Sequence, residues 1–429
     1  MPKKSIGKIN KYRNITKRWS KMRSVLQANI LHDTCKDSNF CMAIGKSYNN
    51  ILHFFNNFHS FAYVAENIHR IGDESSNGVV YRIKYQHRDY DAYTVLKIST
   101  HNRSDNLMYE YIVGSFLNSV IHRISCFIGT FGIFSFNTNQ SWKQVKNGNN
   151  YNIDMKFLTD NLNNIHPTIN TIQKSCTDPY KFCILIENIP SAKSLRDMKK
   201  RFDFIQNDFI FVYYQIYAGL VMLDGNFVHN DLHNSNVLIY EPYTNKYFIY
   251  EYHFRGNIIT FYSPYIAKII DYGRSYFYEN KFNNSSVLLD KICRAKECYP
   301  DCGYDYGYNH IYDYINLKYA RNISADLRLI SYNGHMKKLH NSYNFMNFIT
   351  TISKKVIYKK EHSTPINKKR GYPQSINNIY DAYDAIYEFM TNQQIVNENR
   401  SKYIDSGVYT CQGKLVIYDD GRSMEYIEM

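Results

Sequence analysis

The segment Phe227–Ile239 constrains the fold and the chemistry of this chain more than any other. It places Asp231 and Asn236 five residues apart, just before an apolar run typical of a strand. A second acidic turn at Asp271 follows another apolar run downstream. Carboxylate and amide oxygens are hard ligands that suit Mg²⁺, and an aspartate can accept a hydroxyl proton. The pattern therefore indicates a site that binds a divalent metal and moves a phosphoryl group.

A lysine inside an apolar run supplies a candidate phosphate contact. Lys97 lies in residues 93–98, where an unpaired charge is costly to bury. It must reach solvent, pair with an acid or meet a ligand phosphate. Glu110 lies thirteen residues on, in a segment of helical spacing, and can pair with it.

The turn before these strands is rich in glycine and serine. Gly72 and Gly78 permit close backbone approach to phosphates, and Ser75 and Ser76 add hydrogen-bond donors. A surface β-turn is the alternative for this segment taken alone.

Periodicity predicts an α+β chain, with a β-rich first part and a helical second part. The Asp224-Gly225 pair marks the end of a helix. Residues 137–176 are polar and asparagine-rich, which indicates an insertion or a long loop. We expect strands at 79–85, 93–98, 126–136 and 181–187, helices at 106–120 and 207–223, a β-arm over 247–261 and a short hairpin in 407–429.

Bulk composition is that of a globular protein. Of 429 residues, 44% are hydrophobic and 21% charged, without an apolar run of membrane-spanning length or a signal peptide, so we expect a cytoplasmic chain. The nine cysteines are then reduced thiols. Cys293, Cys298 and Cys302, followed by His310, match no common zinc spacing, and metal binding there is the minor alternative.

Charge is concentrated at the N-terminus. Residues 1–23 hold nine lysines and arginines and no acid, out of a net charge of +14. Residues 1–30 form a basic arm that can contact nucleic acid or an anionic membrane weakly, or remain a solvated tail. The 42 tyrosines follow more simply from an A/T-rich genome than from base stacking.

In this order along the chain, these segments resemble the protein-kinase-like family, nearest to serine/threonine protein kinases encoded by large DNA viruses. The resemblance covers about residues 70–275. Gly78 and Val80 match the end of the glycine-rich loop, Lys97 the ATP-anchoring strand, Glu110 its ion-pair partner, Glu187 and Asn188 the hinge that receives adenine, residues 229–236 the catalytic loop, and residues 271–273 the Asp-Phe-Gly turn.

The resemblance implies a two-lobed fold, with ATP and Mg²⁺ as ligands and a protein as substrate. Residues 31–187 would form the first lobe and 188–429 the second, with the host cytoplasm or virion as the location if the chain is viral. Asp231 would be the catalytic base, and Asn236 and Asp271 would hold Mg²⁺. The set implied to bind nucleotide is Gly72, Ser75, Ser76, Gly78, Val80, Lys97, Glu187 and Asn188.

Some positions depart from the family pattern. The two glycines expected before Gly78 fall on other residues, with Gly72 one place early. His233 replaces the usual lysine or alanine, and can donate to the γ-phosphate. Asn230 replaces an arginine that pairs with a phosphorylated activation loop, so we expect activity without that phosphorylation. His229 is expected to brace the loop, and Asp326 either braces it too or caps a helix.

Three functions follow from these residues, and a fourth, a nucleic-acid-binding protein, rests only on the basic arm and the aromatic content. The first is an ATP-dependent kinase acting on serine and threonine of proteins. The second is a small-molecule phosphotransferase of the same fold, which His233 and the missing Ala-Pro-Glu segment favour. The third is an inactive pseudokinase scaffold, against which the complete set Lys97, Glu110, Asp231, Asn236 and Asp271 argues.

Overall fold

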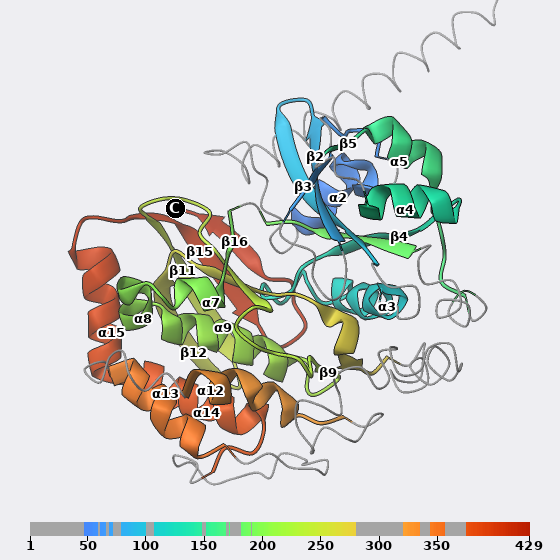
Figure 1. The fold of residues 1–429 in the computed structure, drawn as a ribbon. Coiled ribbons are helices and arrows are strands. Elements are labelled where there is room, and N and C mark those ends of the chain that lie inside the picture. The colour runs from blue at the N-terminus through green and yellow to red at the C-terminus, as the bar shows by residue number, and fades with distance from the viewer. Residues whose placement is uncertain are drawn as a thin grey trace, which may run out of the picture.

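The chain folds as a mixed α+β protein, with a largely antiparallel β region followed by a helix-rich region (Figure 1). The computed structural model describes residues 47–58, 61–65, 68–71, 79–99, 107–147, 152–168, 171, 182–189, 191–279, 321–334, 344–356 and 375–429. The basic arm of residues 1–30, the glycine-rich turn and the cysteines near residue 300 lie outside these ranges.

A seven-stranded antiparallel sheet forms the β region, in the order β5-β1-β2-β3-β7-β4-β6. Its strand at residues 79–87 alternates buried and half-buried residues as far as residue 85, as expected for a sheet with unequal faces. The strands expected near residues 79, 93, 126 and 181 are all present. Their bounds are β1 Ile68–Arg70, β2 Val79–His87, β3 Tyr90–Ile98, β4 Thr130–Phe136, β5 Asn152–Ile153, β6 Leu162–Asn164 and β7 Phe182–Glu187.

The alternative of an insertion over residues 137–176 stays a prediction, but the expectation of a long loop is wrong for much of that segment. It contains α4 (Asn139–Asn147), β5, α5 (Met155–Asn161) and β6. Trp142 is buried and its indole N–H donates to the Ser99 carbonyl at 2.9 Å, while Leu158 is fully buried on α5. A few well-spaced apolar side chains thus dock these helices, and Asn139 at the start of α4 is exposed.

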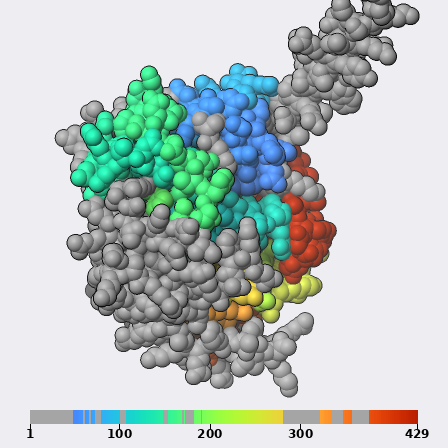
Figure 2. Space-filling model, turned by 90° about the vertical axis from the view of Figure 1, so that its right-hand side faces the viewer, coloured from blue at the N-terminus to red at the C-terminus, as the bar shows by residue number. Residues whose placement is uncertain are grey.

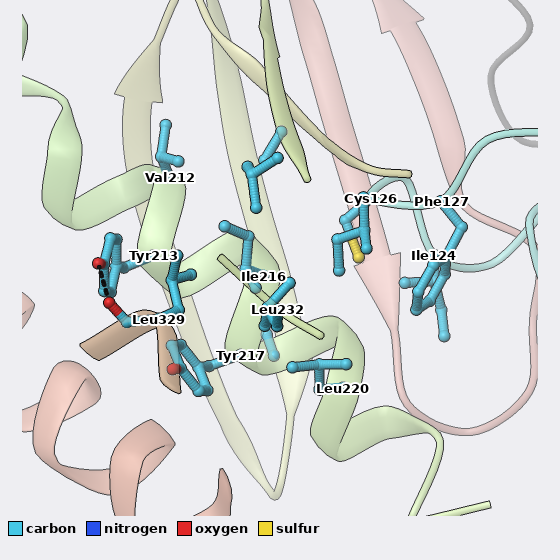
Figure 3. Close-up of a cluster of buried hydrophobic side chains, with 14 of the residues drawn as sticks. Ile124, Cys126, Phe127, Val212, Tyr213, Ile216, Tyr217, Leu220, Leu232 and Leu329 are labelled. Atoms are coloured by element: carbon cyan, nitrogen blue, oxygen red, sulfur yellow. Dashed lines mark hydrogen bonds between the residues drawn. The ribbon is translucent and has the colours of Figure 1, made fainter. Parts of the chain in front are cut away.

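Helix α9 (Phe209–Met222) is the centre of the helical region, and each of its residues from 209 to 221 is buried. It ends where the sequence predicts, since Gly225 has the left-handed φ of +66°. Figure 3 shows its side chains meeting Leu232 of the following loop and Leu329, with Tyr213 donating to the Leu329 carbonyl at 3.2 Å. The loop that carries Asp231 is thus anchored in the main core.

Short strands frame that loop. β9 (Phe227–Val228) pairs with β14 (Tyr276–Phe277), and β10 (Val237–Tyr240) pairs with β13 (Ile266–Ile269) and β8 (Lys193–Ser194). These antiparallel pairs bring the end of the loop at residue 236 next to the turn at residue 271.

The predicted β-arm and C-terminal hairpin are parts of one sheet. β11 (Lys246–Phe254) and β12 (Asn257–Ser263) form the arm, and β15 (Thr410–Tyr418) joins β11 in parallel, with β16 (Glu425–Glu428) at the edge. The Met424 N–H donates to the His122 carbonyl at 2.9 Å, and Figure 2 shows the C-terminal residues in red against this earlier segment. The C-terminal segment therefore contacts the turn that follows helix α3 (Leu107–Asn118).

Further helices lie in both regions of the chain. Helix α14 packs on α9, where the Tyr214 and Tyr383 hydroxyls lie 3.2 Å apart. The further helices are α2 Ser47–Phe54, α3 Leu107–Asn118, α7 Leu195–Met198, α8 Phe202–Asn207, α12 Arg328–Gly334, α13 Asn344–Lys354, α14 Ile379–Met390 and α15 Gln393–Arg400, with 3-10 turns η1 Asn56–Phe58, η3 Tyr272–Arg274 and η5 Ala325–Leu327 and the π-turn η6 Ser401–Asp405. In the part of the chain that the structure describes, no helix has the length and apolar character to cross a membrane.

Candidate active site

The loop between β9 and β10 has its backbone fixed by a buried carboxylate. Asp326 accepts hydrogen bonds from the N–H groups of His229 at 2.8 Å and Asn230 at 2.9 Å. Its side chain is fully buried, and this burial raises its pKa. Of the two roles that the sequence left open for Asp326, bracing the loop is the one observed, since both oxygens are bonded to it.

Two further contacts hold the same loop. His229 lies with Nε2 2.9 Å from the Ile270 carbonyl, so Nε2 carries the proton and Nδ1 accepts from the Asp231 N–H at 3.3 Å. The amides of Asn234 and Asn333 exchange hydrogen bonds of 2.9 and 2.8 Å, and both side chains are buried. The loop is therefore attached to η5, α12 and the strand end at Ile270.

Asn236 and Asp271 lie beside each other across the β10–β13 pair. The Ile270 N–H donates to the Asn236 carbonyl at 3.0 Å, one residue before Asp271. The Asn236 Nδ2 donates to the Asp231 carbonyl at 3.0 Å, which leaves its side-chain oxygen as the outward acceptor. Asp271 has φ 69°, a left-handed conformation that costs energy in a residue other than glycine. Such strain is typical of functional turns.

Lys97 joins the two regions through a pair of ion contacts. Its Nζ lies 2.7 Å from Glu110 Oε2 on α3 and 3.0 Å from Asp271 Oδ1. β3 places Lys97 opposite Val80 of β2, so both predicted nucleotide contacts share this part of the sheet. The Tyr109 hydroxyl also donates to the Ser275 carbonyl at 2.5 Å, which ties α3 to the turn after Asp271.

The pKa values of Lys97, Glu110 and Asp271 are shifted in different directions by their surroundings. Burial lowers the pKa of Lys97, but the neighbouring Asp271 and Glu110 carboxylates more than offset it and the pKa is raised. Burial raises the pKa of Glu110 to about 6, with Asp271 adding to this and Lys97 opposing it. Burial also acts on Asp271, but Lys97 holds the pKa of that more exposed carboxyl below its usual range. Glu110 is therefore the member that titrates first as pH falls toward 6.

Asp231 is engaged by basic side chains that the sequence reasoning missed. Arg274 Nη1 lies 3.2 Å from Asp231 Oδ2, and Arg328 Nη1 contacts Oδ1. Arg274 directly follows the Asp271-Tyr272-Gly273 turn, a position that could have marked it. Arg328 lies 97 residues from Asp231, and no local pattern links them.

His233 also faces Asp231. Its Nε2 lies 3.8 Å from Asp231 Oδ1, and its Nδ1 accepts from the Ser235 N–H at 3.1 Å. Burial lowers its pKa, with Arg328 adding to this effect and Asp231 opposing it. At neutral pH His233 is thus an uncharged imidazole with its N–H on Nε2.

At the strand end expected to bind adenine, the first two backbone N–H groups are already hydrogen-bonded within the protein. The Glu187 N–H donates to the Gly129 carbonyl at 2.7 Å, and the Asn188 N–H donates to the Tyr93 carbonyl at 3.1 Å. The Glu187 carboxylate in turn accepts from the Gly129 N–H at 2.9 Å. Within the described residues, the next N–H along, that of Ile189, makes no hydrogen bond.

The structure thus brings together Val80, Lys97, Glu110, Asp231, His233, Asn236 and Asp271, while Gly72, Ser75, Ser76 and Gly78 lie outside the described residues. Among the residues with described positions, no group of three or more His, Cys, Asp or Glu side chains forms a metal site. Asn236 and Asp271 instead offer an amide and a carboxylate oxygen, a donor pair that fits Mg²⁺ completed by water and phosphate oxygens.

Comparison with known proteins returns no family: no protein-family model and no curated protein matches the sequence of this chain.

Proposed function

We propose that the chain is an ATP- and Mg²⁺-dependent serine/threonine protein kinase with a two-lobed, protein-kinase-like fold. The observation that carries the proposal is the Lys97 ammonium between Glu110 and Asp271, 2.7 and 3.0 Å from their oxygens. Along the sequence, Glu110 precedes the Asp231 loop and Asp271 follows it. A buried lysine paired in this way is well placed to bind phosphates and is costly to retain without such a role.

Each side chain has a role in this proposal. Lys97 binds the α- and β-phosphates, and Glu110 fixes its rotamer. Asn236 and Asp271 hold Mg²⁺, which neutralises the charge that develops on the transferred phosphoryl group. The backbone N–H that donates a hydrogen bond to the adenine is that of Ile189, rather than those of Glu187 and Asn188.

Asp231 acts on the acceptor. One of its oxygens accepts the hydrogen bond of a serine or threonine hydroxyl and orients the hydroxyl lone pair toward the γ-phosphorus. Asp231 takes the hydroxyl proton as the new O–P bond forms and the bond from the γ-phosphorus to the β–γ bridging oxygen breaks, with ADP as the leaving group. The neutral His233 donates its Nε2–H to the γ-phosphate or to Asp231. The loop contacts of Asp326 supply the fixed backbone that this orientation needs.

Two alternatives each have an observation in their favour. A small-molecule phosphotransferase is favoured by His233, at the position where protein kinases carry lysine or alanine. An ATP-binding scaffold without transfer is favoured by the contacts of Arg274 and Arg328 with both oxygens of Asp231.

Radiolabelled ATP with Mg²⁺ and generic protein substrates tests the proposal. We expect wild-type transfer to serine and threonine, and a loss of at least about 100-fold in Asp231→Asn and Lys97→Met. Asp231→Asn should still bind ATP, whereas Lys97→Met should bind it more weakly. Lys200→Met is the matched control, since Lys200 is exposed and pairs with Asp197 on the surface.

The same assay separates the alternatives. Transfer to small alcohols but never to protein would favour the phosphotransferase. ATP binding by wild type without any transfer would favour the scaffold. If wild-type protein bound no ATP in the presence of Mg²⁺, both enzyme functions would be wrong.

A further inference from the structure

The two oxygens of the Asp231 carboxylate have different surroundings. Arg328 contacts Oδ1, and the His233 Nε2 lies 3.8 Å from the same oxygen. Oδ2 is contacted by Arg274 alone, through the longer distance of 3.2 Å, among the residues the structure describes. The side chains of Asp231, Arg274 and Arg328 keep 13, 17 and 13% of their exposed area. Oδ2 thus has one basic neighbour and Oδ1 has two, so movement of Arg274 alone would uncover Oδ2.

Displacing Arg274 has an electrostatic cost that depends on the acceptor. A guanidinium withdrawn from a carboxylate in a largely buried place loses a charge-assisted hydrogen bond that water replaces poorly. A neutral acceptor supplies no anion in exchange. An acceptor with a carboxylate or phosphate near its hydroxyl gives Arg274 a new partner as the hydroxyl takes the Oδ2 position, so an ion pair is kept throughout.

Resting on the proposed function, we propose that Arg274 selects acceptors whose hydroxyl lies next to an anionic group. Arg274 passes from Asp231 to the carboxylate or phosphate of the acceptor, and Arg328 stays on Oδ1 and holds the carboxylate plane. The Arg274 backbone remains in place, since its carbonyl accepts from Asn230 Nδ2 at 3.0 Å. Selection is thus made by a side-chain exchange at the base, and Arg274 is a specificity-determining residue.

Two acceptor pairs test this inference. The first is a serine peptide flanked by aspartates and the same peptide flanked by asparagines. The second is glycerol 3-phosphate and glycerol. Comparing the two pairs shows whether the anionic acceptor is a protein segment or a small alcohol. We expect wild type to favour the anionic member of at least one pair by roughly 10- to 100-fold in kcat/KM, the value of a hydrogen bond to a charged group.

The variant Arg274→Gln gives a readout that a structural role would not. The preference should fall to within about threefold of unity, with turnover of the anionic acceptor lowered and that of the neutral acceptor raised, because Oδ2 is no longer covered by a cation. Arg274→Lys should keep part of the preference, and the exposed Arg400→Gln should keep all of it. Urea midpoints establish that each variant is folded.

A wild-type enzyme without preference, or an Arg274→Gln variant that loses both acceptors equally while folded, would overturn the inference and leave the proposed function standing. Absence of transfer to every acceptor would overturn both.

Discussion

Removing the Asp326 carboxylate should lower the urea concentration at which the protein unfolds. It should also slow any phosphoryl transfer that Asp231 supports. The Asp326 carboxylate is fully buried and accepts two backbone hydrogen bonds, at 2.8 and 2.9 Å. Asp326→Ala leaves both N–H groups without an acceptor, each worth roughly 1–3 kcal/mol. The relief of burying one charge less offsets part of this, and we expect a net loss of about 3 kcal/mol, a large share of a typical 5–15 kcal/mol.

The isosteric variant Asp326→Asn separates hydrogen bonding from volume. Its amide has one acceptor oxygen, and its NH₂ group faces the second backbone N–H, so we expect a loss of about 2 kcal/mol with no cavity. In urea, losses of 2–3 kcal/mol move the midpoint down by about 1 M for a slope near 3 kcal/mol per M. The displaced loop should also lower kcat by at least about 10-fold.

A surface aspartate serves as the control for both variants. Asp405 is 56% exposed and lies 3.8 Å from Arg400, so Asp405→Asn should change stability by less than about 0.5 kcal/mol. Equal midpoints for Asp326→Asn and Asp405→Asn would refute the argument that this buried carboxylate fixes the loop.

Three more predictions concern neighbouring residues. Above about pH 6 Glu110 is charged and bonded to Lys97, and below it the carboxyl is neutral. Steady-state kcat/KM for ATP should therefore fall from pH 7 to 5 in wild type and should fall less in Glu110→Gln, which lacks this carboxyl. Tyr272→Phe should cost about 2 kcal/mol in urea unfolding, because the buried hydroxyl accepts from the Ile128 N–H and donates to the Ile269 carbonyl, whereas the exposed Tyr278→Phe should cost almost nothing. Phosphatase treatment should leave turnover unchanged, because the neutral Asn230 makes no charged contact with a phosphorylated loop; abolished turnover would contradict this.

Local patterns were sufficient for the elements with strong periodicity. Helix α9 and strands β2, β3 and β7 were expected close to their observed places, because each has apolar spacing that matches one secondary structure. The glycine stop at Gly225 has the left-handed φ that its position requires. The pairing of Lys97 with Glu110, thirteen residues away, also followed from the need of a buried lysine for an acid.

Long-range contacts were not accessible in the same way. Parallel pairing of β15 with β11 joins residues more than 150 positions apart, as in Tyr250 opposite Leu415, and neither strand carries a signal for its partner. The contact of Arg328 with Asp231 is of the same kind. The helices α4 and α5 were missed for another reason, since their asparagine-rich sequence concealed the few apolar residues that dock them.

The contacts around residues 229–236 restrict how this site can change. Asp326 holds the backbone at His229, Asn333 holds Asn234, and the Asn230 amide reaches the Arg274 carbonyl, so the loop is bound to three separate elements. A backbone fixed from several sides cannot uncover Asp231 by moving as a whole without breaking buried hydrogen bonds. A rotamer change of Arg274 leaves these backbone hydrogen bonds intact, and its cost is the ion pair with Asp231. Movement of an arginine side chain is therefore the way to uncover the Asp231 carboxylate that leaves the loop backbone in place, which is the exchange that we propose for Arg274.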